Sequence, residues 1–143
     1  MTRRPAWTLS DRLRLLAVAL VLAEGAIHLQ QYEGPLNAVP TINTLFVLNA
    51  VSASTIALMI AGSREVVAVL GALAGLAVTL GALVSLAISR ASTLFDYSEP
   101  TLRTAVELAA MVELAAVLAL AAFVLARRRE TSANVRVDWN QTA

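Results

Sequence analysis

The stretch VVAVLGALAGLAVTLGALVSLAIS, residues Val66–Ser89, decides the fold, because it contains no charged residue and is apolar almost throughout. A helix needs about 20 mainly apolar residues to cross a lipid bilayer. The stretch therefore predicts a membrane-spanning helix over residues 66–89. Gly71 and Gly75 within it form a small-xxx-small pattern, which lets another helix approach closely. We expect these glycines to pack either inside the protein or against a second copy in a homodimer.

Three further apolar runs of spanning length flank this stretch, at residues 13–30, 41–61 and 102–126. Hydrophobic residues make up 58% of the 143-residue chain and charged residues only 15%. A soluble domain carries about a quarter charged residues. We predict an all-α membrane protein, residues 1–126, with four transmembrane helices in an up-down bundle embedded in the lipid bilayer. The polar residues 127–143 are predicted to form a disordered tail.

The arginines predict the orientation, because cytoplasmic segments of membrane proteins are enriched in basic residues. One side of a four-helix arrangement would hold Arg3, Arg4, Arg12, Arg14, Arg64, Arg127, Arg128 and Arg129. The other side holds Arg90 and Arg103 beside acidic residues. Both termini are therefore expected in the cytoplasm of a bacterium, with the protein in its inner membrane. An alternative is a signal peptide cleaved near residues 23–25, where small residues occur. Cleavage would leave the C terminus inside.

Each predicted helix contributes a polar residue near its middle. Glu24 and His28 are four residues apart and share a helix face. A rise of 1.5 Å per residue places them about 16 and 22 Å from the cytoplasmic end. Asn49, Thr79 and Glu113 fall at similar depths in the other helices. If these faces converge, the five residues form one layer across the bundle, called the polar layer.

Intramembrane acids are costly, because a charged residue at a helix centre costs roughly 2.5–3.5 kcal/mol on insertion scales. The acids must point inward, pair or take up a proton. Three interpretations of the polar layer stay open: structural hydrogen bonding, a site for a proton, ion or small ligand, and contact with a partner subunit. Near the outer interface, Glu107 follows Arg103 by four residues, and we predict an ion pair between them.

Other chemistry finds little support in the sequence. The chain has no cysteine and a single histidine. A di-iron bundle needs Glu-x-x-His on two helices. Phosphate loops, nucleophile elbows and dinucleotide fingerprints are absent from the sequence. We therefore expect no enzyme activity, no cofactor, no metal site and no nucleic-acid partner.

One run of residues resembles a group of small, uncharacterised four-helix membrane proteins of actinobacteria. The run comprises His28-Leu29, Tyr32, Val39-Pro40-Thr41-Ile42 and Leu45-Phe46-Val47-Leu48-Asn49. It covers about a quarter of the chain and implies a membrane location without an activity. The position of Glu24 is similar to the first-helix acid of the small multidrug resistance transporters, which binds protons and cationic drugs. This chain departs from them in its two longer outer loops and its aromatic content of 5%.

Two functional hypotheses follow. The first is a non-enzymatic accessory or assembly subunit, which requires a membrane-protein partner. The second is a small transporter or proton-coupled permease that uses Glu24, His28 and Glu113.

Overall fold

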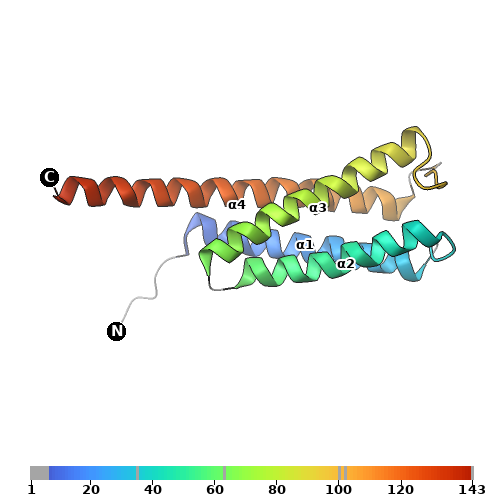
Figure 1. The fold of residues 1–143 in the computed structure, drawn as a ribbon, viewed down its shortest axis with the longest axis horizontal. Coiled ribbons are helices and arrows are strands. Elements are labelled where there is room, and N and C mark those ends of the chain that lie inside the picture. Colours follow the sequence, from blue (N-terminus) through green and yellow to red (C-terminus); the bar gives the residue numbers. More distant parts are fainter. Residues whose placement is uncertain (1–6, 35, 63, 100, 102, 143) are drawn as a thin grey trace.

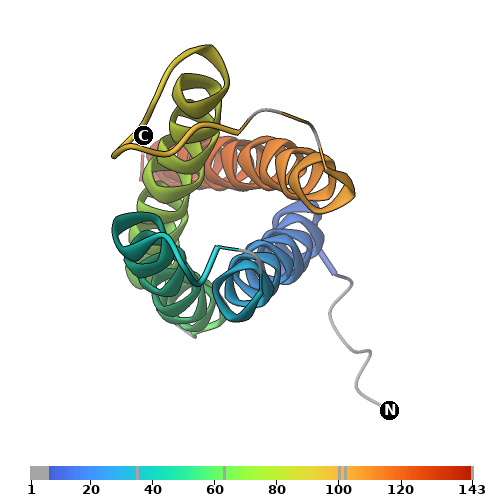
Figure 2. The ribbon, with the colours of Figure 1, turned by 90° about the vertical axis from the view of Figure 1, so that its right-hand side faces the viewer.

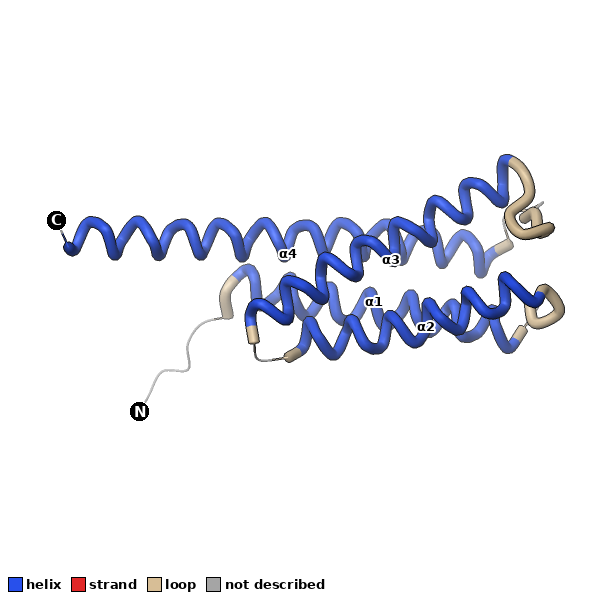
Figure 3. The backbone as a smooth tube through the Cα atoms, in the orientation of Figure 1, coloured by secondary structure: helices blue, strands red, loops and turns tan. Residues whose placement is uncertain are grey.

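The computed structural model describes residues 7–34, 36–62, 64–99, 101 and 103–142, with side chains described up to residue 133. Arg3, Arg4 and the segment 134–143 of the predicted tail thus lie wholly or partly outside the described residues. The regular structure of the described residues is helical (Figures 1 and 3). The four helices are α1 (Leu9–Glu33), α2 (Pro40–Ala61), α3 (Glu65–Ala91) and α4 (Thr104–Thr142).

All four helices are long and apolar enough to cross a membrane. Large apolar side chains cover their outer faces, and Leu58, Val66 and Leu118 are 75%, 72% and 68% exposed. A soluble monomer rarely exposes large contiguous apolar patches. Lipid is the solvent that suits such a surface, and a multi-pass membrane protein is consistent with these helices.

The predicted helix ends lie within a few residues of the observed ones, except at the C-terminal end. We predicted that α4 would stop at residue 126, but it continues to Thr142 in place of a disordered tail. The reason is local, because no glycine or proline follows Pro100 and Ala, Arg and Glu favour helix. The hydroxyls of Thr131 and Ser132 also donate to backbone carbonyls four residues earlier, at 2.9–3.0 Å.

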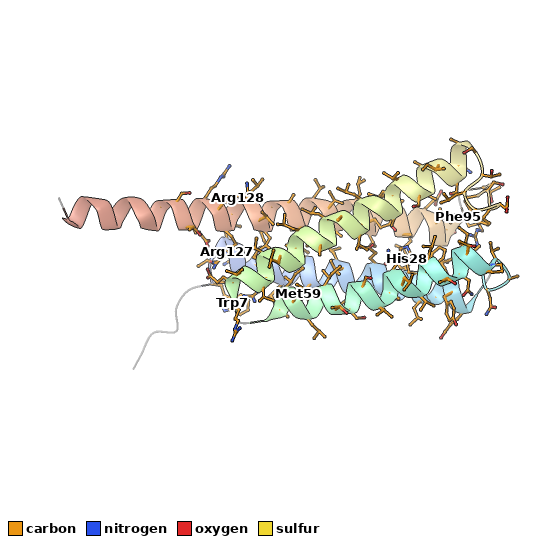
Figure 4. The ribbon with its side chains drawn as sticks, in the orientation of Figure 1. Trp7, His28, Met59, Phe95, Arg127 and Arg128 are labelled. Atoms are coloured by element: carbon orange, nitrogen blue, oxygen red, sulfur yellow. The ribbon has the colours of Figure 1, made fainter. Side chains whose placement is uncertain are left out.

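The four helices form a ring in which α1 contacts α2 and α4, and α3 contacts α2 and α4. Figure 2 shows this ring viewed along the bundle. Figure 4 places Arg127 and Trp7 near one end of the ring and Phe95 at the other. These ends are called the Arg127 end and the Phe95 end.

Helices α2 and α3 approach each other most closely near the Arg127 end, at Gly71 and Gly75. A Cβ atom at Gly71 would lie 2.7 Å from Met59 Cβ, and one at Gly75 would lie 3.2 Å from Ile56 Cγ2. Both glycines therefore pack inside the monomer rather than on a free surface. The apolar core surrounds this contact and includes Ile60, Leu120 and Phe123.

Toward the Phe95 end, α3 diverges from α2, as Figures 1 and 2 both show. The close packing allowed by the glycines at one end thus gives way to a wider separation at the other. This divergence makes room for the candidate site.

Candidate functional site

The structure brings the five residues of the polar layer together inside the bundle. Glu24 accepts a hydrogen bond from Thr79 Oγ1 at 2.8 Å and a longer one from Asn49 Nδ2 at 3.4 Å. These contacts join α1 to α3 and to α2. The rotation of each helix, which depth arithmetic alone does not fix, therefore directs all three side chains inward.

His28 connects the layer to α4. Its Nδ1 lies 3.0 Å from the backbone oxygen of Glu24, and its Nε2 lies 3.4 Å from Glu113 Oε1. A carbonyl oxygen only accepts hydrogen bonds, so Nδ1 carries a hydrogen. The ring of Phe46 packs against the imidazole with a centroid distance of 4.9 Å. His28 is therefore held in one orientation by a hydrogen bond and an aromatic contact.

The layer is buried but not fully hydrogen-bonded. The exposed fractions of Glu24 and Glu113 are 1% and 2%. Among the described residues, Glu113 Oε2 and Asn49 Oδ1 are buried and have no hydrogen-bond partner. An unpaired buried polar atom is costly. Both atoms are therefore available to a ligand.

A cavity of about 340 Å³ reaches from the loops at the Phe95 end to this layer. Its lining is mostly apolar, with His28, Asn49 and Glu113 among its polar groups. Figure 4 shows His28 in the half of the bundle nearer Phe95. Ligand pockets are commonly of this kind, with apolar walls and a few convergent polar groups.

The loop between α3 and α4 carries a second polar cluster, which corrects one prediction. Arg103 pairs with Glu99, through Nη2 at 2.8 Å and Nε at 3.2 Å, and not with the predicted Glu107. Glu107 is exposed, whereas Glu99 is 4% exposed. Glu99 precedes Arg103 by four residues, but both lie in the loop before α4, where the helical spacing rule does not apply.

A tight turn positions this cluster. Leu94 and Tyr97 exchange two backbone hydrogen bonds, and Phe95 and Asp96 between them have φ values of 49° and 61°. Positive φ at both central residues defines a type I′ turn, which a phenylalanine rarely enters. Tyr97 Oη then donates to Glu99 Oε2 at 2.5 Å.

We expect Tyr97 to ionise at a higher pH than an ordinary tyrosine does. Burial and the hydrogen bond to Glu99 raise the pKa of Tyr97 to about 12 from 10.0. The contribution of this raised pKa to stability is complete below pH 10 and is lost as the pH rises through about 12. Spectrophotometric titration of tyrosinate absorbance checks this, and Tyr97→Phe should remove the high-pH phase. A Tyr97 midpoint near 10 would contradict the expectation.

The pKa of Glu99, in the same cluster, shifts in the opposite direction. Burial tends to raise the pKa of Glu99, but hydrogen bonds from Arg103 and Tyr97 outweigh it and hold that pKa below 4.5. The stabilising contribution of Glu99 is therefore present above pH 4.5 and is lost as the pH falls through the lowered value. Together the two groups stabilise the loop most effectively between about pH 4.5 and 10.

Comparisons of the chain with protein-family models, with curated proteins and with solved structures find no match. The resemblances drawn from sequence stay predictions. Function is therefore inferred from the residues of the site itself.

Proposed function

We propose that the protein lies in a bacterial inner membrane, with its helices in up-down order and both termini in the cytoplasm. The arginines support this orientation, because Arg12, Arg14 and Arg64 belong to the same side as the Arg127–Arg129 cluster. At the Phe95 end, the charge of Arg103 is compensated by Glu99. The Phe95 end then faces the periplasm.

We further propose that the protein is a small, non-enzymatic transporter that admits a small polar ligand or ion from the periplasm to the polar layer. The observation that carries this proposal is the cavity whose inner end holds the unpaired Glu113 Oε2. A purely structural layer would favour pairing of both carboxylate oxygens, because an unsatisfied buried atom destabilises the fold.

The accessory-subunit hypothesis stays as a second proposal. It is supported by α4, which extends beyond the other helices at the Arg127 end (Figure 1). Such an extension offers a surface to a cytoplasmic partner. It does not account for a cavity at the opposite end, so we favour the transporter.

Accessibility of the cavity tests the transporter proposal, and the absence of cysteine from the sequence makes a single-cysteine design clean. Ser52 lines the cavity on α2, whereas Ser54 on the same helix is exposed on the outer face. We expect a charged, membrane-impermeant thiosulfonate to modify Ser52→Cys in spheroplasts at least about tenfold faster than Ser54→Cys. The reason is that the thiolate is the reactive form and lipid disfavours it.

A second cysteine variant, Ser85→Cys, reports on the cavity from α3. If both cavity positions react as slowly as Ser54→Cys, the cavity is closed to the periplasm and the transporter proposal fails. The accessory-subunit hypothesis would then take precedence. Far-UV circular dichroism of each variant verifies that the helices are retained.

A further inference from the structure

We infer that Glu24, His28 and Glu113 form a binding site for a divalent transition-metal ion of the Zn²⁺ class. These three residues are called the metal triad. The inference deepens the proposed function and rests on it, since the ion would enter through the cavity. It also departs from the sequence-based expectation of no metal site, because the contact between α1 and α4 that joins His28 to Glu113 follows from helix packing and not from a sequence motif.

The spacing of the ligand atoms suits one metal ion. One ligand atom from each residue of the triad lies within 4.8 Å of the others. His28 Nε2 and Glu113 Oε1 are 3.4 Å apart. Zinc bonds of about 2.0–2.2 Å in a tetrahedron imply ligand separations of about 3.3–3.6 Å. The His28–Glu113 edge already has this length, whereas the edges to Glu24, at up to 4.8 Å, would shorten on binding by at most about 1.5 Å.

His28 is oriented as metal-bound histidines usually are. Such a histidine donates its second ring N–H to a carboxylate or backbone carbonyl, which fixes the tautomer. Here Nδ1 donates to the backbone oxygen of Glu24. This leaves the lone pair of Nε2 directed toward Glu113. The aromatic contact with Phe46 restrains the ring further.

The two carboxylates of the triad differ in their hydrogen bonding. Thr79 and Asn49 donate to Glu24 and orient it, as outer-shell groups do around metal ligands. Glu113 Oε2 is buried without a hydrogen-bond partner among the described residues, and so is Asn49 Oδ1. A metal ion bound by both oxygens of Glu113 would satisfy Oε2, and Asn49 Oδ1 is a further unpaired oxygen of the polar layer.

A divalent cation would balance the charge of the triad when both of its carboxylates are ionised. Two ionised carboxylates and a neutral imidazole carry a charge of −2, which a divalent ion cancels in full. Buried uncompensated charge is costly. The salt bridges of the described residues give Glu113 only His28 as a partner, and Glu24 none. Without a cation, protons on the triad would have to balance this charge.

The ligand types select the class of ion. Imidazole with carboxylates suits zinc and other first-row divalent ions, whereas copper(I) prefers sulfur ligands. Calcium and magnesium require six or more oxygen ligands or several waters. The triad offers one nitrogen and carboxylate oxygens, so we expect Zn²⁺ or Co²⁺ to bind in preference to either.

The experiment measures Zn²⁺ bound to the full-length protein in mild detergent, after chelation, reloading and removal of free ion. We expect one Zn²⁺ per chain, and a visible absorption band of Co²⁺ that Zn²⁺ abolishes by displacement. Glu113→Gln and His28→Asn should each weaken binding by about 100-fold or more, since each removes a ligand. Glu107→Gln changes an exposed acid on the same helix and should bind as the unmodified protein does.

Size-exclusion chromatography and circular dichroism identify variants that fail to fold. The Co²⁺ spectrum of the unmodified protein still tests the inference if a variant does fail. Absence of stoichiometric Zn²⁺ on the unmodified protein overturns the inference, as does unchanged binding by folded Glu113→Gln and His28→Asn. Cysteine labelling separates the two proposals. If the cysteines in the cavity are labelled but the protein binds no Zn²⁺, only the metal inference is overturned. If they are not labelled, the transporter proposal fails, whatever the result for Zn²⁺.

Discussion

Replacing Gly71 by leucine is expected to cost about 3 kcal/mol or more of stability, because overpacking a tight contact costs 1–3 kcal/mol and occasionally more. A Cβ at this position would lie 2.7 Å from Met59 Cβ and 3.2 Å from the backbone nitrogen of Ile60. Neither atom can rotate away, since one is backbone and the other is bonded directly to it. Helix α3 would have to separate from α2. Unfolding in a graded series of denaturing detergent, followed by circular dichroism, measures the loss.

Ala74→Leu is the matched control, because Ala74 lies on the same helix with an exposed side chain. Its leucine should point into lipid or detergent and change stability little. Equal unfolding midpoints for Gly71→Leu and Ala74→Leu would contradict the close α2–α3 contact.

The same substitution ten residues later should have a different result. An added Cβ at Gly81 meets no atom within 4 Å, and Gly81 lines the cavity. Gly81→Leu should therefore fold, with a gain of up to about 1 kcal/mol from improved helix propensity. Its side chain should occupy the cavity and slow thiol modification of Ser52→Cys by about tenfold or more. The measurement is the labelling rate in the double variant.

Gly81→Ala supplies the graded comparison, because a single methyl group fills far less of the cavity than a leucine does. It should share the gain in helix propensity and leave labelling largely unchanged. If Gly81→Leu folds and labels at the unmodified rate, the path to Ser52 does not pass Gly81, and the cavity assigned here is not the route of entry.

The four helices were predictable, because spanning length and apolarity are properties of each segment taken alone. The depths of Glu24, Thr79 and Glu113 were also predictable, since helical rise is constant. Their mutual contacts were not, because contacts depend on the rotation and tilt of helices packed against one another. The cavity depends on the divergence of α3 from α2, which no single segment encodes.

The two departures have separate physical causes. The end of α4 was predicted from a change in polarity at Arg127, but polarity ends a membrane span and not a helix. Helical spacing predicts Glu107 of α4 as the partner of Arg103, whereas the structure supplies Glu99 from the preceding loop. There the type I′ turn at Phe95 and Asp96 precedes Glu99, whose backbone nitrogen donates to Ser89. Loop geometry of this kind leaves a weak trace in sequence.

Because α4 is long, a small tilt of this helix displaces its C-terminal end by several ångströms. Its 39 residues span about 58 Å, nearly twice the hydrocarbon thickness of a bilayer. Glu113 lies near one end of this rod, and about 23 Å of helix continue beyond Arg127. A ten-degree tilt of α4 about Arg127 would move its C-terminal end by roughly 4 Å. Because residues 104–142 contain no glycine or proline at which a helix commonly bends, a change in tilt at the polar layer would also displace the C-terminal end of α4.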